Sequence, residues 1–344
     1  MNTPDETPSA DVRKVSESIL SMLLPFRREE HPEHHENVRC FGPQLEQIGH
    51  FVGAGEELLF TLPAFPCKSP NTRKVLGHLP DLGELLSLRF LAQLCEDVGS
   101  VYAPGARLLI CSDGHVFGDL VRVPDDHITE YTAVLREMID LEGRGRLEVF
   151  NLDDVYGDLG YDEKRARLTA EYATSIDAIR AEVRADERAL AMYRGMTRFM
   201  FEDALSPAYA GSRAALLRDS RHRAYGVIQR SRAWSDLIDR RLRGSVRLSI
   251  HPQACGTPKF GIRLLDIDDS WLTPWHSVAV RAGSRVTLMK RAEAEQVGRL
   301  VFAQERLGHF VLERLPVRAP RGADEAAERA PSSAHLRAAA PVPL

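Results

Sequence analysis

Short apolar runs bounded by turn residues recur along this chain, and they predict buried β-strands. The first three runs occupy residues 58–62, 107–111 and 146–150. Between them, apolar positions recur at helical spacing over residues 85–98 and 125–142. Asp81 and Glu84 stand where a capping box would begin the first of these helices. This strand–helix–strand–helix order predicts an α/β fold with a Rossmann-like, mostly parallel sheet flanked by helices.

The remainder of the chain divides into a helical part and a β-rich part. Helical spacing is present over 12–25 and over 162–204, where we expect one or two long helices, and it continues to about Arg243. Short strands are then expected at 245–250, 260–265, 277–280, 285–289, 299–302 and 309–312. We therefore predict a disordered N-terminus (1–11), a Rossmann-like core with a helical segment (12–244), a β-rich C-terminal lobe completing the active site (245–317), and a disordered tail (318–344).

Composition and charge narrow the class of protein. The 344 residues are 44% hydrophobic and 27% charged, which is ordinary for a globular protein. A net charge of −4 argues against nucleic acid as the main partner. No apolar run approaches the roughly 18 residues of a membrane span, and the N-terminus lacks the features of a secretory signal. The five cysteines have no CxxC spacing, so we expect reduced thiols in a cytoplasmic protein, with neither disulfides nor a zinc site.

A basic loop follows the first predicted strand. It contains three cations, three short polar side chains and two stiffening prolines, namely Lys68, Arg73, Lys74, Ser69, Asn71, Thr72, Pro66 and Pro70. Such a loop suits a phosphate or a carboxylate, because these anions need several charge-assisted donors fixed in advance. The alternative is a solvated basic loop. In a parallel sheet ligands bind at the carboxyl ends of strands, so this loop should meet the one that follows residue 111.

The second loop, Ser112-Asp113-Gly114, carries a carboxylate that could hold a hydroxyl or an ammonium group, and Asp119 follows six residues later. Gly114 would allow a tight turn with positive φ. The alternative is an Asp-Gly turn that merely ends the strand.

Polar residues also mark the β-rich part. Arg247, Ser249 and His251 fall on one face of a predicted strand, and Lys259 could reach the same site. In Thr273-Pro-Trp-His276, Trp275 could wall a pocket and His276 could act as a general acid or base near neutral pH. The alternatives are a half-exposed edge strand, a histidine buried with one hydrogen bond, and a lysine that extends to solvent.

Six segments together resemble one family, and they span about residues 50–315 in consistent order. They are Phe65-Pro-Cys-Lys-Ser-Pro-Asn71, Lys74-Val-Leu-Gly-His-Leu-Pro-Asp-Leu-Gly-Glu84, Val101-Tyr-Ala-Pro-Gly-Ala106, Ser112-Asp-Gly-His-Val-Phe-Gly-Asp119, Arg247-Leu-Ser-Ile-His-Pro252 and Thr273-Pro-Trp-His276 with Leu288-Met-Lys-Arg291. The chain is similar to the isonitrile (isocyanide) synthases, also described as the pyoverdine/dityrosine biosynthesis family. By contrast, GxGxxG, P-loop, HExxH and GxSxG motifs are absent from the sequence.

The resemblance implies a Rossmann-like fold and a specific reaction. The α-amino group of an aromatic L-amino acid, tyrosine or tryptophan, becomes an isonitrile whose carbon comes from C2 of ribulose 5-phosphate. Neither a metal nor an organic cofactor is implied. An Fe(II)/2-oxoglutarate oxygenase is the expected pathway partner. Such an enzyme would be classed as a transferase or lyase of secondary metabolism.

These substrates carry a phosphate and a carboxylate, so the site needs two positions for anions. Our hypothesis is that Lys68, Arg73 and Lys74 hold the phosphate and that Arg247 or Lys259 holds the other anion. His251 and His276 would transfer protons, while Ser112 and Asp113 orient sugar hydroxyls. Ser69, Asn71, Asp119 and Trp275 complete the expected substrate-binding set.

Two departures and two alternatives accompany this resemblance. Cys67 stands where an aromatic or other apolar residue is expected, and His115 stands where arginine is frequent. Both could tune the substrate pocket. The family's fungal branch suggests a formamide product, N-formyl tyrosine, as an alternative to an isonitrile. A non-catalytic regulator that binds a phosphosugar or an amino acid is the alternative from another class.

Overall fold

The computed structural model describes residues 9–28, 38–265, 272–304 and 306–312. The expected disordered ends, 1–11 and 318–344, lie outside the described residues except for residues 9–11. Ser9 accepts a hydrogen bond from the Val12 N–H and caps the first helix, which starts at Ala10.

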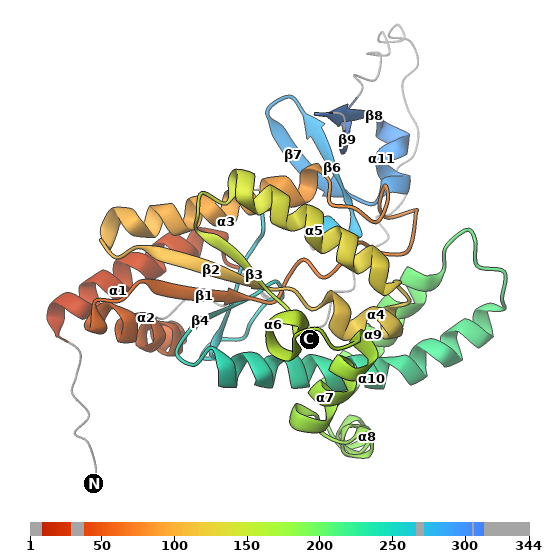
Figure 1. The fold of residues 1–344 in the computed structure, drawn as a ribbon, viewed down its shortest axis with the longest axis horizontal. Helices are drawn as coiled ribbons and strands as arrows, with labels where there is room; N and C mark the ends of the chain where they lie inside the picture. Colours follow the sequence, from red (N-terminus) through yellow and green to blue (C-terminus); the bar gives the residue numbers. More distant parts are fainter. Residues whose placement is uncertain (1–8, 29–37, 266–271, 305, 313–344) are drawn as a thin grey trace, which may run out of the picture.

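Five parallel strands form the central sheet in the order β3-β2-β1-β4-β5 (Figure 1). Their bounds are β1 Leu58–Leu62, β2 Ala106–Cys111, β3 Leu147–Phe150, β4 Val246–Ser249 and β5 Lys259–Gly261. β1 pairs with β2 on one side and with β4 on the other, where Thr61 lies opposite Arg247. The predicted parallel α/β sheet is confirmed.

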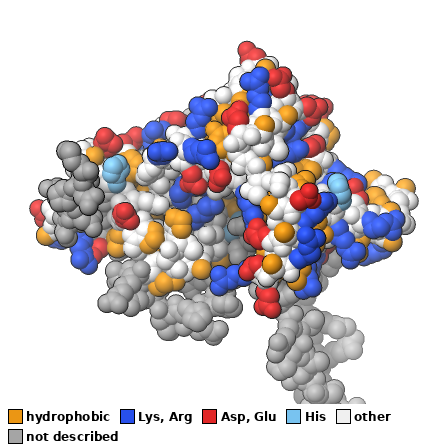
Figure 2. Space-filling view, turned by 90° about the horizontal axis from the view of Figure 1, so that it is seen from below, with side chains coloured by type: hydrophobic (Ala, Val, Ile, Leu, Met, Phe, Trp, Pro, Cys, Tyr) orange, Lys and Arg blue, Asp and Glu red, His pale blue; other side chains and the backbone are white. Residues whose placement is uncertain are grey.

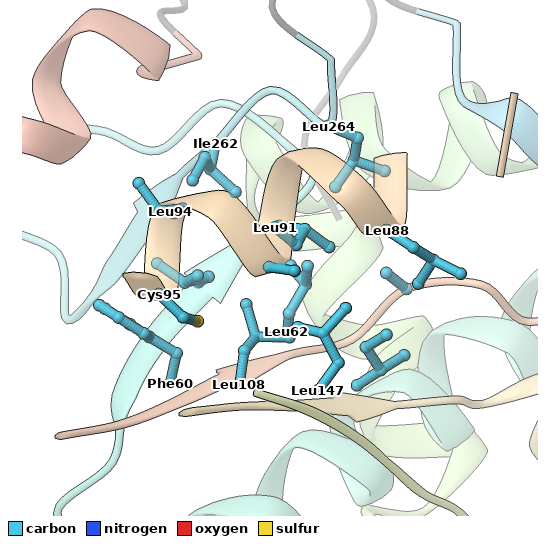
Figure 3. Close-up of a cluster of buried hydrophobic side chains, with 14 of the residues drawn as sticks. Phe60, Leu62, Leu88, Leu91, Leu94, Cys95, Leu108, Leu147, Ile262 and Leu264 are labelled. Carbon is cyan, nitrogen blue, oxygen red and sulfur yellow. The ribbon is translucent and has the colours of Figure 1, made fainter. Parts of the chain in front are cut away.

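One face of this sheet is covered by α3 (Leu82–Val101) and α5 (Asp125–Glu142). The predicted capping box is present, since Asp81 accepts from the Gly83 N–H and Glu84 accepts from the Asp81 N–H, both at 2.9 Å. Figure 3 shows strand side chains interlocking with α3, and those labelled there include Phe60, Leu62, Leu108, Leu147, Leu88, Leu91, Leu94 and Cys95. Burying one such leucine or phenylalanine contributes about 1.5–3 kcal/mol, so this layer accounts for much of the core's stability.

The other face is covered by α10 (Arg213–Arg241), whose Trp234 donates to the Cys111 carbonyl at 3.4 Å and stacks on Phe150. Residues 162–204 form three helices, not one or two. These are α7 Tyr161–Tyr172, α8 Ile176–Ala185 and α9 Glu187–Ala204. Ser175 and Asp186 accept backbone N–H groups at 3.2 and 2.7 Å, and these caps begin new helices at both breaks.

Shorter elements complete the core around the sheet. They are α1 Ala10–Leu23, η1 Leu24–Phe26, η2 Val38–Phe41, α2 Gly42–Ala54, α4 Gly114–Val121 and α6 Leu152–Tyr156. α1 and α2 contribute Ile19, Leu23 and Ile48 to the main hydrophobic core.

A second, four-stranded sheet follows in the order β7-β6-β9-β8. Its elements are β6 Val278–Ala282, β7 Arg285–Met289, α11 Arg291–Val297, β8 Gly298–Ala303 and β9 Leu307–Leu312. The 3-10 turn η3, Pro274–His276, leads into it. The sequence pattern assigns residues 245–265 to this lobe, but β4 and β5 extend the parallel sheet instead. Local apolar runs cannot reveal which sheet a strand joins, because pairing partners are distant in sequence.

The prediction of five reduced cysteines is wrong for one pair. Cys40 and Cys255, separated by 215 residues, form a disulfide, whereas Cys67, Cys95 and Cys111 are free and buried. The backbone brings the pair together, since the Gly256 N–H donates to the Cys40 carbonyl at 2.9 Å. Sequence spacing alone gives no information about such a long-range approach.

Three features of the described residues concern contact with a membrane, a metal ion or nucleic acid. No helix in the described ranges combines the length and hydrophobicity needed to cross a lipid bilayer. Nor do three or more His, Cys, Asp or Glu side chains gather there in a way that could hold a metal ion. Lys and Arg side chains are interspersed with Asp and Glu over the face shown in Figure 2, which is not the broad positive field that favours nucleic acid.

Candidate active site

The order of the strands places a topological switch point between β1 and β4. Strand order reverses there, and in such sheets ligands bind outside the carboxyl ends of the strands at this point. Three loops leave the sheet at these ends, after Leu62, after Cys111 and after Ser249.

The first two loops are locked together by a close backbone approach. Ser112 donates its hydroxyl to the Phe65 carbonyl at 2.9 Å, and Phe65 itself has a φ of 54°. A Cβ atom on Gly114 would lie 2.0 Å from the Pro66 carbonyl oxygen. Gly114 is therefore needed for this contact and not for the expected positive φ. This donation holds the Ser112 hydroxyl against the loop, and its expected role in orienting a sugar hydroxyl stays a prediction.

Lys68 is fully occupied within the chain. Its ammonium group donates to Asp81 at 2.9 Å, to Glu84 at 2.8 Å and to the Pro274 carbonyl at 3.0 Å, and its side chain has no exposed surface. The two carboxylates outweigh the effect of burial and raise the pKa of Lys68. An ammonium group has three donors. Contrary to the sequence-based hypothesis, Lys68 has none left for an anion.

The rest of the basic loop is anchored on α9. Ser69 and Lys74 both donate to Asp203, at 2.6 and 2.7 Å. The Asn71 side chain donates to the Glu202 carbonyl and accepts from the Arg73 N–H, both at 3.0 Å, so it shapes the turn. Only Arg73 among these side chains is exposed. The expected anion site in this loop is thus largely neutralised by Asp203, a residue that sequence reasoning missed.

The turn η3 carries His276 to the same place. The Ser69 N–H donates to the Trp275 carbonyl at 2.9 Å, while the Trp275 ring packs on Phe65 and is 2% exposed. Trp275 therefore belongs to the core and does not wall an open pocket. The Phe199 ring, which the sequence analysis did not identify, packs edge-to-face with the His276 ring, with 5.0 Å between the ring centres.

Both candidate histidines are neutral at pH 7. Burial lowers the pKa of His276 to about 4, and its Nδ1 lies 3.0 Å from the Thr273 hydroxyl. Burial also lowers the pKa of His251 to about 4, with further contributions from Arg28, Lys259 and His276. No hydrogen bond of the His251 ring is found in the part of the chain that the structure describes. A titration near neutral pH, which the sequence analysis expects of His276, is therefore not found for this residue.

Asp113 is the group whose titration matches neutral pH. Its carboxylate is half-buried, pairs with no side chain among the described residues, and has a pKa that burial raises to about 7. It lies close to Cys67, whose thiol pKa is raised by burial and by the charges of Asp113 and Asp203. The charge of Asp203 also affects the pKa of His276, so Asp113, Cys67, Asp203 and His276 lie near one another. A general acid or base works best with a pKa near the working pH.

Arg247 and Lys259 lie side by side in register on β4 and β5. Both donate to the hydroxyl of Ser235 on α10, at 3.3 and 3.2 Å. Burial and the charge of Arg247 lower the pKa of Lys259 to about 8. The charge of Lys259 in turn lowers the pKa of His251, so Lys259 lies near that ring.

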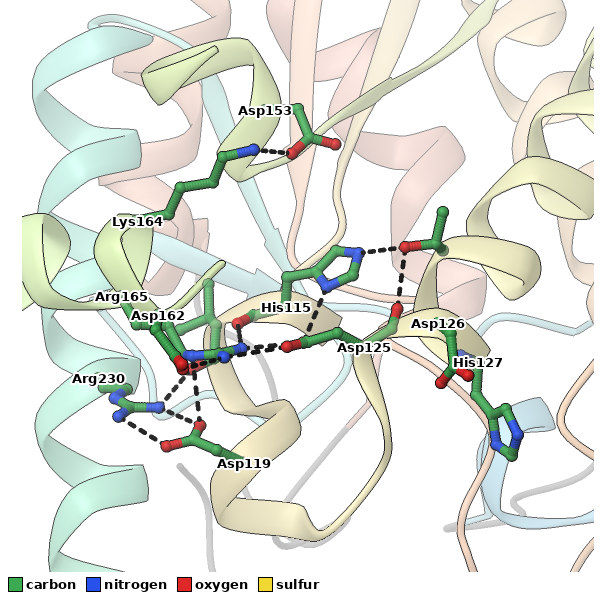
Figure 4. Close-up of polar contacts among 12 residues, drawn as sticks. His115, Asp119, Asp125, Asp126, His127, Asp153, Asp162, Lys164, Arg165 and Arg230 are labelled. Carbon is green, nitrogen blue, oxygen red and sulfur yellow. Dashed lines mark hydrogen bonds and ion pairs between the residues drawn. The ribbon is translucent and has the colours of Figure 1, made fainter. Parts of the chain in front are cut away.

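Asp119 and His115 belong to a separate network, shown in Figure 4. Asp119 pairs with Arg230 and Arg165, and His115 stacks on Tyr161 with 3.5 Å between ring centres. A depression of about 420 Å³ is lined there by Asp119, Asp162, Arg165, Ala166, Thr169, Ala170 and Arg230. Asp119, on α4, is thus engaged in ion pairs with side chains of α7 and α10, and its expected substrate-binding role stays a prediction.

Fold and site together define an α/β protein with ionisable groups gathered at the switch point of a parallel sheet. The chain belongs to the pyoverdine/dityrosine biosynthesis protein family, whose model matches residues 48–301.

Individual relatives agree with this assignment. The chain is 46% identical to an L-tyrosine isonitrile synthase of Pseudomonas aeruginosa over 317 residues, covering 89% of this chain and 95% of the relative. It is 42% identical to an L-tryptophan isonitrile synthase of Fischerella ambigua over 299 residues, covering 86% and 90%. The crystal structure of the PvcA protein from Pseudomonas aeruginosa matches with a TM-score of 0.84 at 46% identity, covering 87% of this chain and 100% of that chain.

Proposed function

We propose that this chain is an isonitrile synthase that acts on L-tyrosine or L-tryptophan, with ribulose 5-phosphate as the carbon donor. The observation that carries the proposal is that hydrogen bonds join the loops after β1 and β2 to the turn η3, so that Asp113 and His276 lie on adjoining segments. The Asp113 carboxylate has no side-chain partner among the described residues. The identities of 46% and 42% to tyrosine and tryptophan isonitrile synthases support the same reaction.

The first chemical steps match these groups. The amine nitrogen must lose a proton, bond to the C2 carbonyl carbon of the sugar, and form a carbinolamine that then expels water. Asp113, with a pKa of about 7, would take the proton from the amine and return it to the departing hydroxyl. The neutral rings of His251 and His276 would accept hydrogen bonds from the reacting groups.

The aromatic substrate would lie near η3. Phe199 is half-buried, and its ring packs edge-to-face with His276. A tyrosine or indole ring packed beside Phe199 would gain about 0.5–1.5 kcal/mol from the aromatic pair beyond the area it buries. We propose that the C-terminal lobe completes the active site through this turn. We also propose that an Fe(II)/2-oxoglutarate oxygenase acts on the product.

The test is incubation of the protein with ribulose 5-phosphate and a mixture of the twenty amino acids, followed by mass spectrometry. An isonitrile carries one carbon more and two hydrogens fewer than its amino acid. A formamide is heavier than that isonitrile by one water, and its formation would support the alternative enzyme. Ligand binding without consumption of any amino acid would favour a regulator and overturn the proposal. The Asp113→Asn protein is the matched control.

A further inference from the structure

The cations of the basic loop and those of β4 and β5 differ in how far neighbouring acceptors compensate their charges. Lys68 and Lys74, from the basic loop, donate to Asp81, Glu84 and Asp203 at 2.7–2.9 Å. Arg247 and Lys259 share one neutral acceptor, the Ser235 hydroxyl, and Arg247 also contacts the exposed Asp239. The positive charges of Arg247 and Lys259 are therefore less well compensated than those of Lys68 and Lys74.

Arg247 is the clearest instance of an unsatisfied donor. The residue is 5% exposed, and its buried Nε has no hydrogen-bond partner among the described residues. Its Nη1 contacts Asp239, and its Nη2 reaches Ser235. Since buried donors are almost always paired in folded proteins, an orphaned guanidinium N–H indicates a missing acceptor.

The nearby carboxylates supply only weak compensation. The Asp239 side chain is 55% exposed, so water screens its charge, and Asp236 is exposed as well. Accordingly, the pKa of Lys259 is lowered to about 8 by burial and by Arg247 despite the opposing effect of Asp236. Burial likewise lowers the pKa of Arg247. A doubly charged anion would relieve both shifts.

We propose that Arg247, Lys259 and Ser235 bind the phosphate group of a phosphate monoester, the sugar substrate of the proposed reaction. The identity of the physiological ligand rests on the proposed function, whereas phosphate binding by these three residues does not depend on it. Three donors from β4, β5 and α10 match a tetrahedral dianion, whereas one arginine suffices for a planar carboxylate. The phosphate site thus moves from the basic loop, where the sequence pattern predicts it, to the two strands. The ester end of the ligand would point toward His251.

Calorimetric titration with inorganic phosphate, and then with ribulose 5-phosphate, tests this site directly. Lys259→Met should weaken the binding of both ligands by about 10- to 100-fold, which is the usual effect of losing a charge-assisted hydrogen bond. Ser235→Ala should weaken it by several-fold and serves as a milder second variant. Arg73→Met, which removes an exposed cation of the basic loop, is the matched control and should bind phosphate like the wild type.

Several outcomes would overturn the site. One is loss of phosphate binding in Arg73→Met with retention in Lys259→Met, and another is the absence of phosphate and ribulose 5-phosphate binding in the wild type. A third is weakened binding of L-tyrosine, in place of phosphate, in Lys259→Met, which would make the pair a carboxylate site. If phosphate binds through Lys259 but no amino acid is consumed, the site stands and the proposed reaction fails. If isonitrile forms and Lys259→Met leaves the KM for the sugar unchanged, the reaction stands and the site fails.

Discussion

The Nζ atom of Lys68 lies 3.0 Å from the carbonyl oxygen of Pro274, and this hydrogen bond ties the loop after β1 to the turn that carries His276. Together with Asp81 and Glu84, it forms a buried polar junction between the two sheets. We infer that Lys68 positions His276 and does not bind a substrate anion.

Replacement of Lys68 by Met should therefore lower stability as well as activity. The change leaves Asp81 and Glu84 buried without their cation, which typically costs about 3–5 kcal/mol. Urea denaturation would measure the free energy of unfolding. The double variant Lys68→Met with Glu84→Gln should recover part of the lost stability, because one of the two buried, unpaired carboxylates is removed. Equal stability of wild type and Lys68→Met would show that the junction contributes nothing.

Asp113→Asn should reduce turnover by about 10²–10⁴-fold and remove a pH dependence. As the base, Asp113 must be ionised, so wild-type kcat/KM should rise with pH through about 7, and the variant should lack this rise. A rate profile that keeps its rise near pH 7 in Asp113→Asn would assign the base to another group.

The same substitution has an opposite effect on stability. The folded pKa of Asp113 is about 7, above the roughly 3.9 expected in the unfolded chain, so ionisation destabilises the folded state as pH rises between these values. Asp113→Asn should therefore be more stable than wild type at pH 8 and equally stable below about pH 4. Thermal denaturation at both pH values would measure this difference.

His276→Ala should lower turnover by roughly 2- to 10-fold, because a hydrogen bond to the reacting groups is lost, while the fold stays intact at neutral pH. Because the folded pKa is about 4 and the unfolded value about 6.5, wild-type stability should fall as pH drops through this window. The variant should lose less stability over the same range. Normal turnover in His276→Ala would remove the proposed role, and an unchanged acid profile would contradict the pKa shift.

Gly114→Ala should displace the loop after β1, since the new Cβ would lie 2.0 Å from the Pro66 carbonyl oxygen. Activity should fall sharply, and stability should fall by at least the roughly 1–3 kcal/mol typical of overpacking. Gly99→Ala is the matched control: Gly99 is also helical, a Cβ added there would meet no atom within 4 Å, and the variant should gain up to about 1 kcal/mol. Similar behaviour of the two variants in denaturation experiments would show that the contact at Gly114 is unimportant.

Local sequence pattern is sufficient to predict the helices and strands whose formation depends on interactions between residues close together in the chain. It predicts strand 58–62 and helix 125–142 with the bounds that the structure has, because apolar periodicity and caps act within a few residues. The positions of both motif loops at strand ends follow from the same pattern.

Long-range partners cannot be predicted in this way. Asp203 neutralises Lys74 from 129 residues away, and Cys40 bonds to Cys255 across 215 residues. A cation in a loop has the same sequence pattern whether a distant carboxylate or a ligand satisfies it. Likewise, β4 and β5 have the apolar runs of a separate lobe but belong to the parallel sheet, where β4 pairs with β1. Only the fold distinguishes Lys68, whose ammonium group makes three hydrogen bonds, from Arg247, whose Nε has no hydrogen-bond partner among the described residues.

In the proposed reaction, the protein transfers a carbon atom from a sugar phosphate to the amine of an aromatic amino acid. The most direct measurement is carbon-13 NMR of the product made from L-tyrosine or L-tryptophan with ribulose 5-phosphate labelled at C2. We predict that the label appears in the isonitrile carbon of the product. An isonitrile without the label, or an amino acid returned unchanged with the sugar intact, would contradict the account.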